Sequence, residues 1–151
     1  MSLFSSPLLA LGEQAPSFRL LNHNGHSVGP TEAMGECGLI LLFFSSSWLP
    51  GDLALLKDYA QAYPQLQAAG VNLLALSSIN WETLHHLANQ MNSPFPLVFD
   101  PCCRFSKYYQ TMLIPKFVTG RAIYGVNPEG RIILARKQAS PEETLAAFQA
   151  L

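Results

Sequence analysis

Residues 43–52, FFSSSWLPGD, set three hydroxyl groups and a carboxylate where a hydrophobic stretch gives way to a helical pattern. In small α/β redox proteins such a turn often carries the nucleophile, because the N-terminus of a helix stabilises a thiolate. Here the turn offers Ser45, Ser46, Ser47 and Asp52 but no thiol. A serine nucleophile needs a base and an orienting acid, and none of these serines lies in a G-x-S-x-G sequence. We therefore interpret them as hydroxyls that cap the loop.

Two adjacent thiols form a second candidate site. Cys102 and Cys103 follow Asp100 and Pro101 at the expected start of a helix, where a thiolate is favoured. They could be a redox or thiol-sensing site, or a vicinal disulfide. Alternatively, they are two small residues packed at the start of a helix, since adjacent helical side chains diverge by about 100°. We interpret Cys37, before the first hydrophobic stretch, as an inert loop thiol.

The histidines give no metal-binding pattern. His85 and His86 lie in the helical pattern of residues 81–91, where His86 points away from the apolar stripe and His85 flanks it. His23 and His26 flank a turn. No C-x-x-C or H-x-x-x-H spacing supports a zinc site, so we expect exposed histidines and no bound metal.

The composition limits the partners. Only 13% of the 151 residues are charged, half the roughly 25% that is usual, and the apolar surface that this leaves predicts a homodimer or another protein partner. A net charge of -1 favours neither nucleic acid nor an acidic membrane. The longest apolar run, residues 38–44, is too short to span a bilayer. Three cysteines and an N-terminus without a basic leader segment predict a reducing, cytoplasmic location.

Strand and helix patterns alternate without a repeat or linker, which predicts one domain over residues 1–151. Continuous apolar runs indicate buried strands, and turn residues at 127–130 predict a hairpin. The expected strands are 17–21, 38–45, 71–76, 95–99, 122–126 and 131–135. The expected helices are one from Asp52 with a kink at Pro64 and an end at Gly70, then 81–91, 102–109, and a last one with a Ser140–Glu143 capping box. This order predicts an α/β protein with a central mixed sheet flanked by helices, on the thioredoxin-like plan.

Short motifs recur along the chain from Leu11 onward. They are Gly12-x-x-Ala15-Pro16-x-Phe18, Gly25-x-x-Val28, Pro50-Gly51, Gly70-Val71, Leu76-Ser77, Pro94-Phe95-Pro96-Leu97-x-Phe99-Asp100, and RAIYGVNPEGRI at 121–132. In this order and spacing they resemble the peroxiredoxins of the AhpC/TSA family. The resemblance implies a thioredoxin-like fold of the peroxiredoxin type. It also implies thiol-dependent reduction of hydroperoxides as the family reaction, without a cofactor.

The resemblance assigns the serine-rich turn. In the family this turn carries a proline, a threonine four residues on, and the peroxidatic cysteine three residues beyond. Matched on Pro50-Gly51, these positions hold Ser45, Leu49 and Asp52, while the family's arginine matches Arg121. A thiolate can accept an oxygen atom and be recycled by thiols, whereas a carboxylate cannot. We therefore predict an Asp52–Arg121 ion pair and no peroxidase chemistry at this turn.

A second alignment reaches the same result: residues 48–52 have the outline of a W-C-x-x-C redox turn with both cysteines replaced. Three functions remain open. The chain is a non-catalytic binding or regulatory protein, or a thiol oxidoreductase or peroxidase that uses Cys102 or Cys103. In the third alternative it is a sensor that holds a small polar ligand at the turn of Pro50, Gly51 and Asp52, opposite Arg121.

Overall fold

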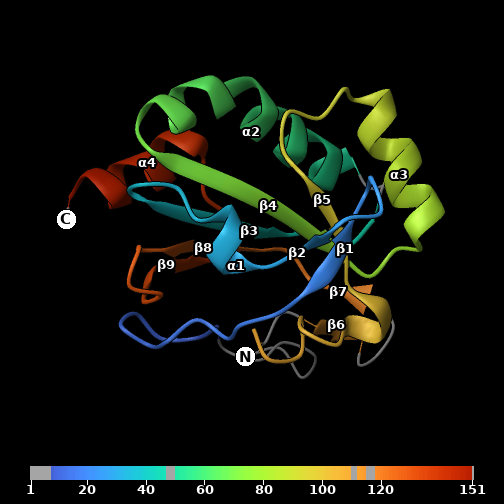
Figure 1. The fold of residues 1–151 in the computed structure, drawn as a ribbon, viewed down its shortest axis with the longest axis horizontal. Helices are drawn as coiled ribbons and strands as arrows, with labels where there is room; N and C mark the ends of the chain where they lie inside the picture. Colours follow the sequence, from blue (N-terminus) through green and yellow to red (C-terminus); the bar gives the residue numbers. More distant parts are fainter. Residues whose placement is uncertain (1–7, 47–49, 110–111, 115–117, 151) are drawn as a thin grey trace.

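The computed structural model describes residues 8–46, 50–109, 112–114 and 118–150 (Figure 1). Seven strands form one mixed sheet in the order β2-β1-β5-β4-β3-β8-β9. Their bounds are β1 Leu20–Asn22, β2 Ser27–Val28, β3 Gly38–Phe43, β4 Val71–Ser77, β5 Leu97–Phe99, β8 Ala122–Val126 and β9 Ile132–Arg136. A second, two-stranded sheet pairs β6, Met112–Ile114, with β7, Val118–Thr119.

The centre of the large sheet is parallel and buried. β3 pairs parallel with β4, and β4 pairs parallel with β5, while β8 lies antiparallel against β3. All six residues of β3 are buried, as expected for a continuous apolar run covered on both faces. Because β8 is antiparallel, it begins at the edge of the sheet where β3 ends, with Ala122 opposite Phe43.

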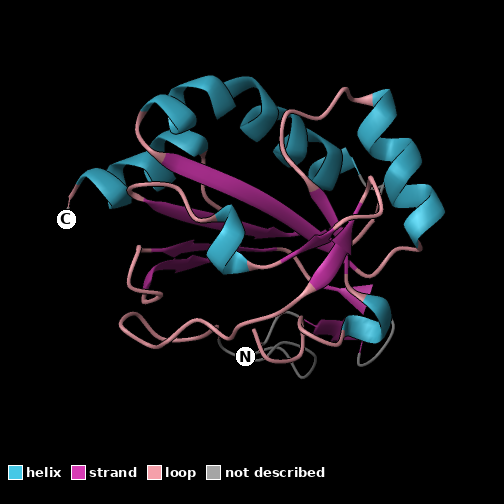
Figure 2. Ribbon diagram, in the orientation of Figure 1, coloured by secondary structure: helices cyan, strands magenta, loops and turns pink. Residues whose placement is uncertain are grey.

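The long helices gather on one face of the sheet (Figures 1 and 2). They are α2, Pro50–Ala68, α3, Trp81–Gln90, and α4, Pro141–Gln149. Their apolar side chains pack with one face of β3 and β4 in a core that includes Leu56, Leu84 and Phe148. The short helix α1, Pro30–Ala33, and residues 105–109 pack with the other face, around Phe18 and Tyr124.

Most expected elements are confirmed. The β8–β9 hairpin, the buried strands and the helix over 81–90 lie where their patterns predict. The strand expected over 17–21 begins only at Leu20, as β1, and forms a hairpin with β2. Ser140 Oγ accepts the N–H of Glu143, whose side chain accepts the N–H of Ser140, so the predicted capping box is present. Helix α2 begins at Pro50 and continues through Pro64, and Gly70 follows its end with a φ of 79°.

The helix predicted over residues 102–109 is wrong. A single 3-10 turn, η1, spans Pro101–Cys103, and only turns follow it. Cys102 and Cys103 both have a φ of 56°, in the left-handed region that regular helices exclude. The two strands β6 and β7 had no predicted counterpart. In the described part of the chain, no helix is long and apolar enough to cross a membrane.

Candidate functional site

The loops after the parallel strands meet at the carboxyl edge of the sheet. Ser77, the buried last residue of β4, ties three of them together. Its Oγ donates to the carbonyl oxygen of Ser45 at 3.4 Å, and its own carbonyl oxygen accepts the N–H of Asp100 at 2.9 Å. Strand β8 runs antiparallel to β3 and starts at the same edge, so Arg121, the residue before β8, also lies at this edge. The topology therefore assembles the site from segments far apart in sequence.

Asp52 is the charged centre of this edge. It lies in the first turn of α2, and only 1% of the residue is exposed. Its Oδ2 accepts the backbone N–H groups of Ser45 at 2.8 Å and Ser46 at 3.1 Å. Its Oδ1 accepts Nε of Arg121 at 2.9 Å and Nη2 of Arg121 at 2.7 Å. Four N–H donors thus surround one carboxylate, which has about four lone-pair directions.

Arg121 closes the site from the side of β8. The predicted Asp52–Arg121 ion pair is present, and the arginine side chain is 33% exposed. Its Nη1 donates to Oε1 of Gln138 at 3.0 Å. A Cβ on Gly51 would lie 2.5 Å from Nη2, so the glycine leaves the room that this guanidinium occupies. Gly51 of the proposed binding turn is therefore a spacer for Arg121.

The loop that carries Gln138 is itself fixed on α2. Tyr59 Oη donates to the carbonyl oxygen of Ala139 at 2.9 Å and lies 2.7 Å from Oγ1 of Thr144. Burial raises the pKa of Tyr59 to about 12, so its hydroxyl stays protonated and able to donate at neutral pH. Helix α2 therefore supplies Asp52 at its start and, through Tyr59 two turns later, fixes the loop that carries Gln138, the second partner of Arg121.

The anion at the centre of this arrangement is a carboxylate, and the described residues that bond to it include no thiol. The four N–H donors use the four acceptor directions of the Asp52 carboxylate, so none is left for a ligand. Of the two charged groups of the pair, the Arg121 side chain is 33% exposed and the Asp52 side chain 1%. An anionic ligand would have to compete with Asp52 for the Arg121 guanidinium.

The other predicted site residues fall in different environments. Ser45 contributes its backbone N–H and carbonyl to the site, rather than a nucleophilic hydroxyl. Pro50 is exposed at the start of α2. Leu49 lies outside the described residues. Sequence reasoning missed the N–H groups of Ser45 and Ser46 and the amide of Gln138, because backbone donors and a lone glutamine leave no motif.

The paired thiols lie at the same edge of the sheet, after β5. Cys102 is exposed and Cys103 is buried, and the structure holds both as thiols. The turn η1 that contains them lies against β7, which ends two residues before Arg121. The Asp100 carboxylate fixes this segment by accepting N–H groups of Phe105 and Ser106, at 2.9 and 2.7 Å. The predicted helix N-terminus that would activate these thiols is not formed here.

The histidines serve the fold. His26 and His86 are exposed, as predicted, whereas His23 and His85 are half-buried. The ring of His85 stacks on Trp81 at a centroid distance of 5.0 Å. Among the described residues, no three His, Cys, Asp or Glu side chains lie together so that they could hold a metal ion. The chain does contain one G-x-S-x-G sequence, at 25–29. Its serine, Ser27, lies in β2 of a hairpin, whereas a nucleophile elbow needs a strand-to-helix turn.

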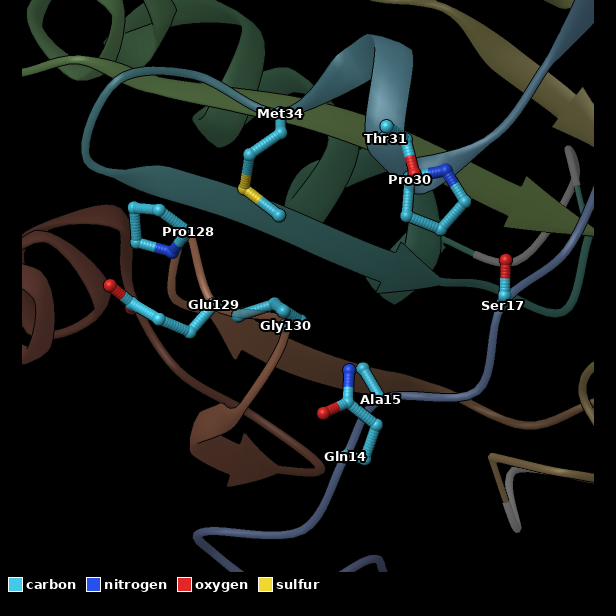
Figure 3. A pocket seen from close by; sticks show the side chains of 10 residues that line it. Gln14, Ala15, Ser17, Pro30, Thr31, Met34, Pro128, Glu129 and Gly130 are labelled. Atoms are coloured by element: carbon cyan, nitrogen blue, oxygen red, sulfur yellow. The ribbon is translucent and has the colours of Figure 1, made fainter.

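A separate pocket of about 310 Å³ lies at the other end of β8 (Figure 3). It is enclosed by the N-terminal segment, α1 and the β8–β9 turn. The side chains of Gln14, Thr31 and Glu129 give it a polar part, and Met34 gives it an apolar one. No sequence motif pointed to this pocket because its walls come from three distant segments.

Comparisons with known proteins agree with the architecture. The family model described as AhpC/TSA family matches residues 11–135. Rv2521 of Mycobacterium tuberculosis, described as a peroxiredoxin, is 25% identical over 134 residues, which are 85% of each chain. The solved structure of peroxidoxin BcpB from Mycobacterium tuberculosis has a TM-score of 0.85 at 12% identity, over 93% of this chain and 97% of that one. A PrxQ mutant from Xylella fastidiosa has a TM-score of 0.81 at 16% identity, over 96% of each chain.

The two structural likenesses establish the fold, and the family model covers most of the chain. They agree with the motifs and with the observed strand order. This chain belongs to the AhpC/TSA family and has the thioredoxin-like fold of the peroxiredoxins.

Proposed function

We propose that Asp52 occupies the position of the family's peroxidatic cysteine, and that this chain is a catalytically degenerate peroxiredoxin with a binding or regulatory role. The observation that carries the proposal is the environment of the Asp52 carboxylate. It is buried at the start of α2 and accepts four N–H groups, two of them from Arg121. The same surroundings would favour a thiolate, since both groups are anions at a helix N-terminus.

The proposed loss of chemistry follows from the identity of this anion. In the family reaction a thiolate attacks one peroxide oxygen, the O–O bond breaks, and the sulfur becomes a sulfenate while the alcohol leaves. Two thiols then return the sulfenate to thiolate, and water and a disulfide are released. A carboxylate has no sulfur lone pair that can take up the peroxide oxygen and be reduced again by thiols, so it cannot take part in this cycle. Asp52 therefore retains the charge of the site without its reactivity.

The remaining role would be carried by the surface. The low share of charged residues, 13%, supports contact with a protein partner or a second copy of the chain. We propose a single-domain homodimer in the cytoplasm, and light scattering should give twice the monomer mass. A ligand-sensing role has weaker support, because the acceptor directions of Asp52 are already used.

One observation favours a second candidate function, thiol peroxidase or oxidoreductase activity at Cys102. This thiol is exposed, at the same sheet edge as Arg121, and would be the group that forms the sulfenate. Hydroperoxide would be the oxidant and an external thiol the reductant, in the balanced cycle given above.

A steady-state assay separates the two candidates. Hydroperoxide consumption with a thiol reductant would be compared for the native protein, Asp52→Cys, Asp52→Ser and Cys102→Ser. The proposal predicts background rates for the native protein, Asp52→Ser and Cys102→Ser, and turnover only for Asp52→Cys. Turnover by the native protein that disappears in Cys102→Ser would overturn the proposal and establish the second candidate.

A further inference from the structure

The turn between β1 and β2 is held on the rest of the molecule by a small set of bonds to backbone atoms. The Trp81 indole N–H of α3 donates to the carbonyl oxygen of Asn22 at 2.9 Å. Nδ1 of His85, also on α3, lies 2.6 Å from the carbonyl oxygen of His23. On the other side, the backbone N–H of Leu97 in β5 donates to Nδ1 of His23 at 3.0 Å.

These contacts fix the protonation state of His23. A backbone N–H is only a donor, so Nδ1 of His23 must be unprotonated to accept it. A carbonyl oxygen is only an acceptor, so Nδ1 of His85 carries a proton. A proton added to His23 at Nδ1 would point at the N–H of Leu97. Because Leu97 is fully buried, its N–H has no water to replace the lost acceptor.

We propose that residues 22–26 form an acid-sensitive latch, docked on α3 and β5 while His23 is neutral and released when Nδ1 of His23 takes up a proton. The inference is independent of the proposed function, because it rests on contacts of the β1–β2 turn alone. Release would free the carbonyl oxygen that Trp81 contacts and the N–H of Leu97 together.

In the part of the chain that the structure describes, no carboxylate interacts with the His23 ring that would keep it in place once protonated. The titratable group facing His23 from α3 is His85, whose protonation would add a like charge. The one formally charged side chain of α3 is the exposed Glu82, in its first turn. β5 contributes only apolar side chains, and His26 of the same turn is exposed.

The direction of the pH effect follows from burial. Burial lowers the pKa of His23 from its ordinary value of 6.5. The neutral, docked form is thus favoured above pH 6.5, and the latch opens as the pH falls through the lower pKa of the folded protein.

The test follows Trp81 fluorescence between pH 7.5 and 5 in a Trp48→Phe background, where Trp81 is the only tryptophan. His23→Asn keeps an acceptor oxygen near the place of Nδ1 but cannot titrate, and His26→Asn is the matched control on the same turn. We expect a transition with a midpoint below pH 6.5 in the parent and in His26→Asn, and none in His23→Asn. Hydrogen exchange of the Leu97 amide, corrected for its intrinsic pH dependence, should rise at least tenfold across the same transition.

The remaining outcomes overturn the latch. The same fluorescence transition in His23→Asn would assign the pH effect to His85 or to another group. A parent protein without any transition, or with a transition that leaves Leu97 exchange unchanged, would show that protonation does not release the turn.

Discussion

At the scale of single residues, the proposal depends on the Asp52 carboxylate and the N–H groups that it accepts. Asp52 places a carboxylate where four N–H donors converge, and those donors would suit a thiolate equally well. Gly51 leaves the space that the Arg121 guanidinium needs. Under the proposed assignment of Asp52, the groups that stabilise an anion are kept and the oxidisable atom is replaced.

The Asp52–Arg121 pair should contribute strongly to stability. Arg121→Met leaves a buried carboxylate with only two N–H partners. We expect the free energy of unfolding to fall by about 3 kcal/mol. This value is at the lower end of the range for buried pairs, because Arg121 is partly exposed. Urea denaturation measures this loss. Arg136→Met is the matched control, because Arg136 pairs with Glu143 on the surface and should change stability much less. Equal effects of the two substitutions would contradict the buried role of the pair.

At the scale of elements, the sequence predicts the parts whose signals are local. The all-apolar β3 and the Ser140–Glu143 box are confirmed because each depends on residues close together in sequence. The pairing of Asp52 with Arg121 was predictable only through the family resemblance, since 69 residues separate them. The helix expected over 102–109 fails because Asp100 captures the N–H groups of the segment in a tight turn.

Asp100 should control access to the second thiol. Its carboxylate, fully buried, accepts two N–H groups and the hydroxyl of Ser106, and Asp100→Ala removes all three bonds. We expect the loss of these three bonds to lower the local stability of the turn by more than about 1.4 kcal/mol, which makes its open state at least about tenfold more populated. Alkylation of the buried Cys103 should accelerate by the same factor. Mass spectrometry resolves Cys103 from the exposed Cys102, whose rate should stay unchanged.

The control for this experiment is Asp58→Ala, which removes an exposed carboxylate from α2. It should leave the alkylation of both cysteines at native rates. If Cys103 in Asp100→Ala reacts as slowly as in the native protein, the carboxylate does not hold the turn closed.

At the scale of the whole molecule, the fold does not depend on which residue occupies the position of Asp52. The fold matches peroxiredoxin structures at 12–16% identity, so few side chains are needed to preserve it. The buried parallel strands fix the sheet edge, and that edge positions Arg121 and the start of α2 whichever anion lies between them. The proposed replacement of the nucleophile by Asp52 is therefore compatible with the observed fold.

The most direct test is single-turnover oxidation, read by mass spectrometry. The native protein and Asp52→Cys would each receive one equivalent of hydroperoxide in the presence of a sulfenate-trapping reagent. We predict rapid trapping at position 52 of the variant and none at Cys37, Cys102 or Cys103 of the native protein in the same time. Trapping at Cys102 of the native protein, or a variant that reacts no faster than an ordinary exposed thiol, would contradict the assignment of Asp52 to the peroxidatic position.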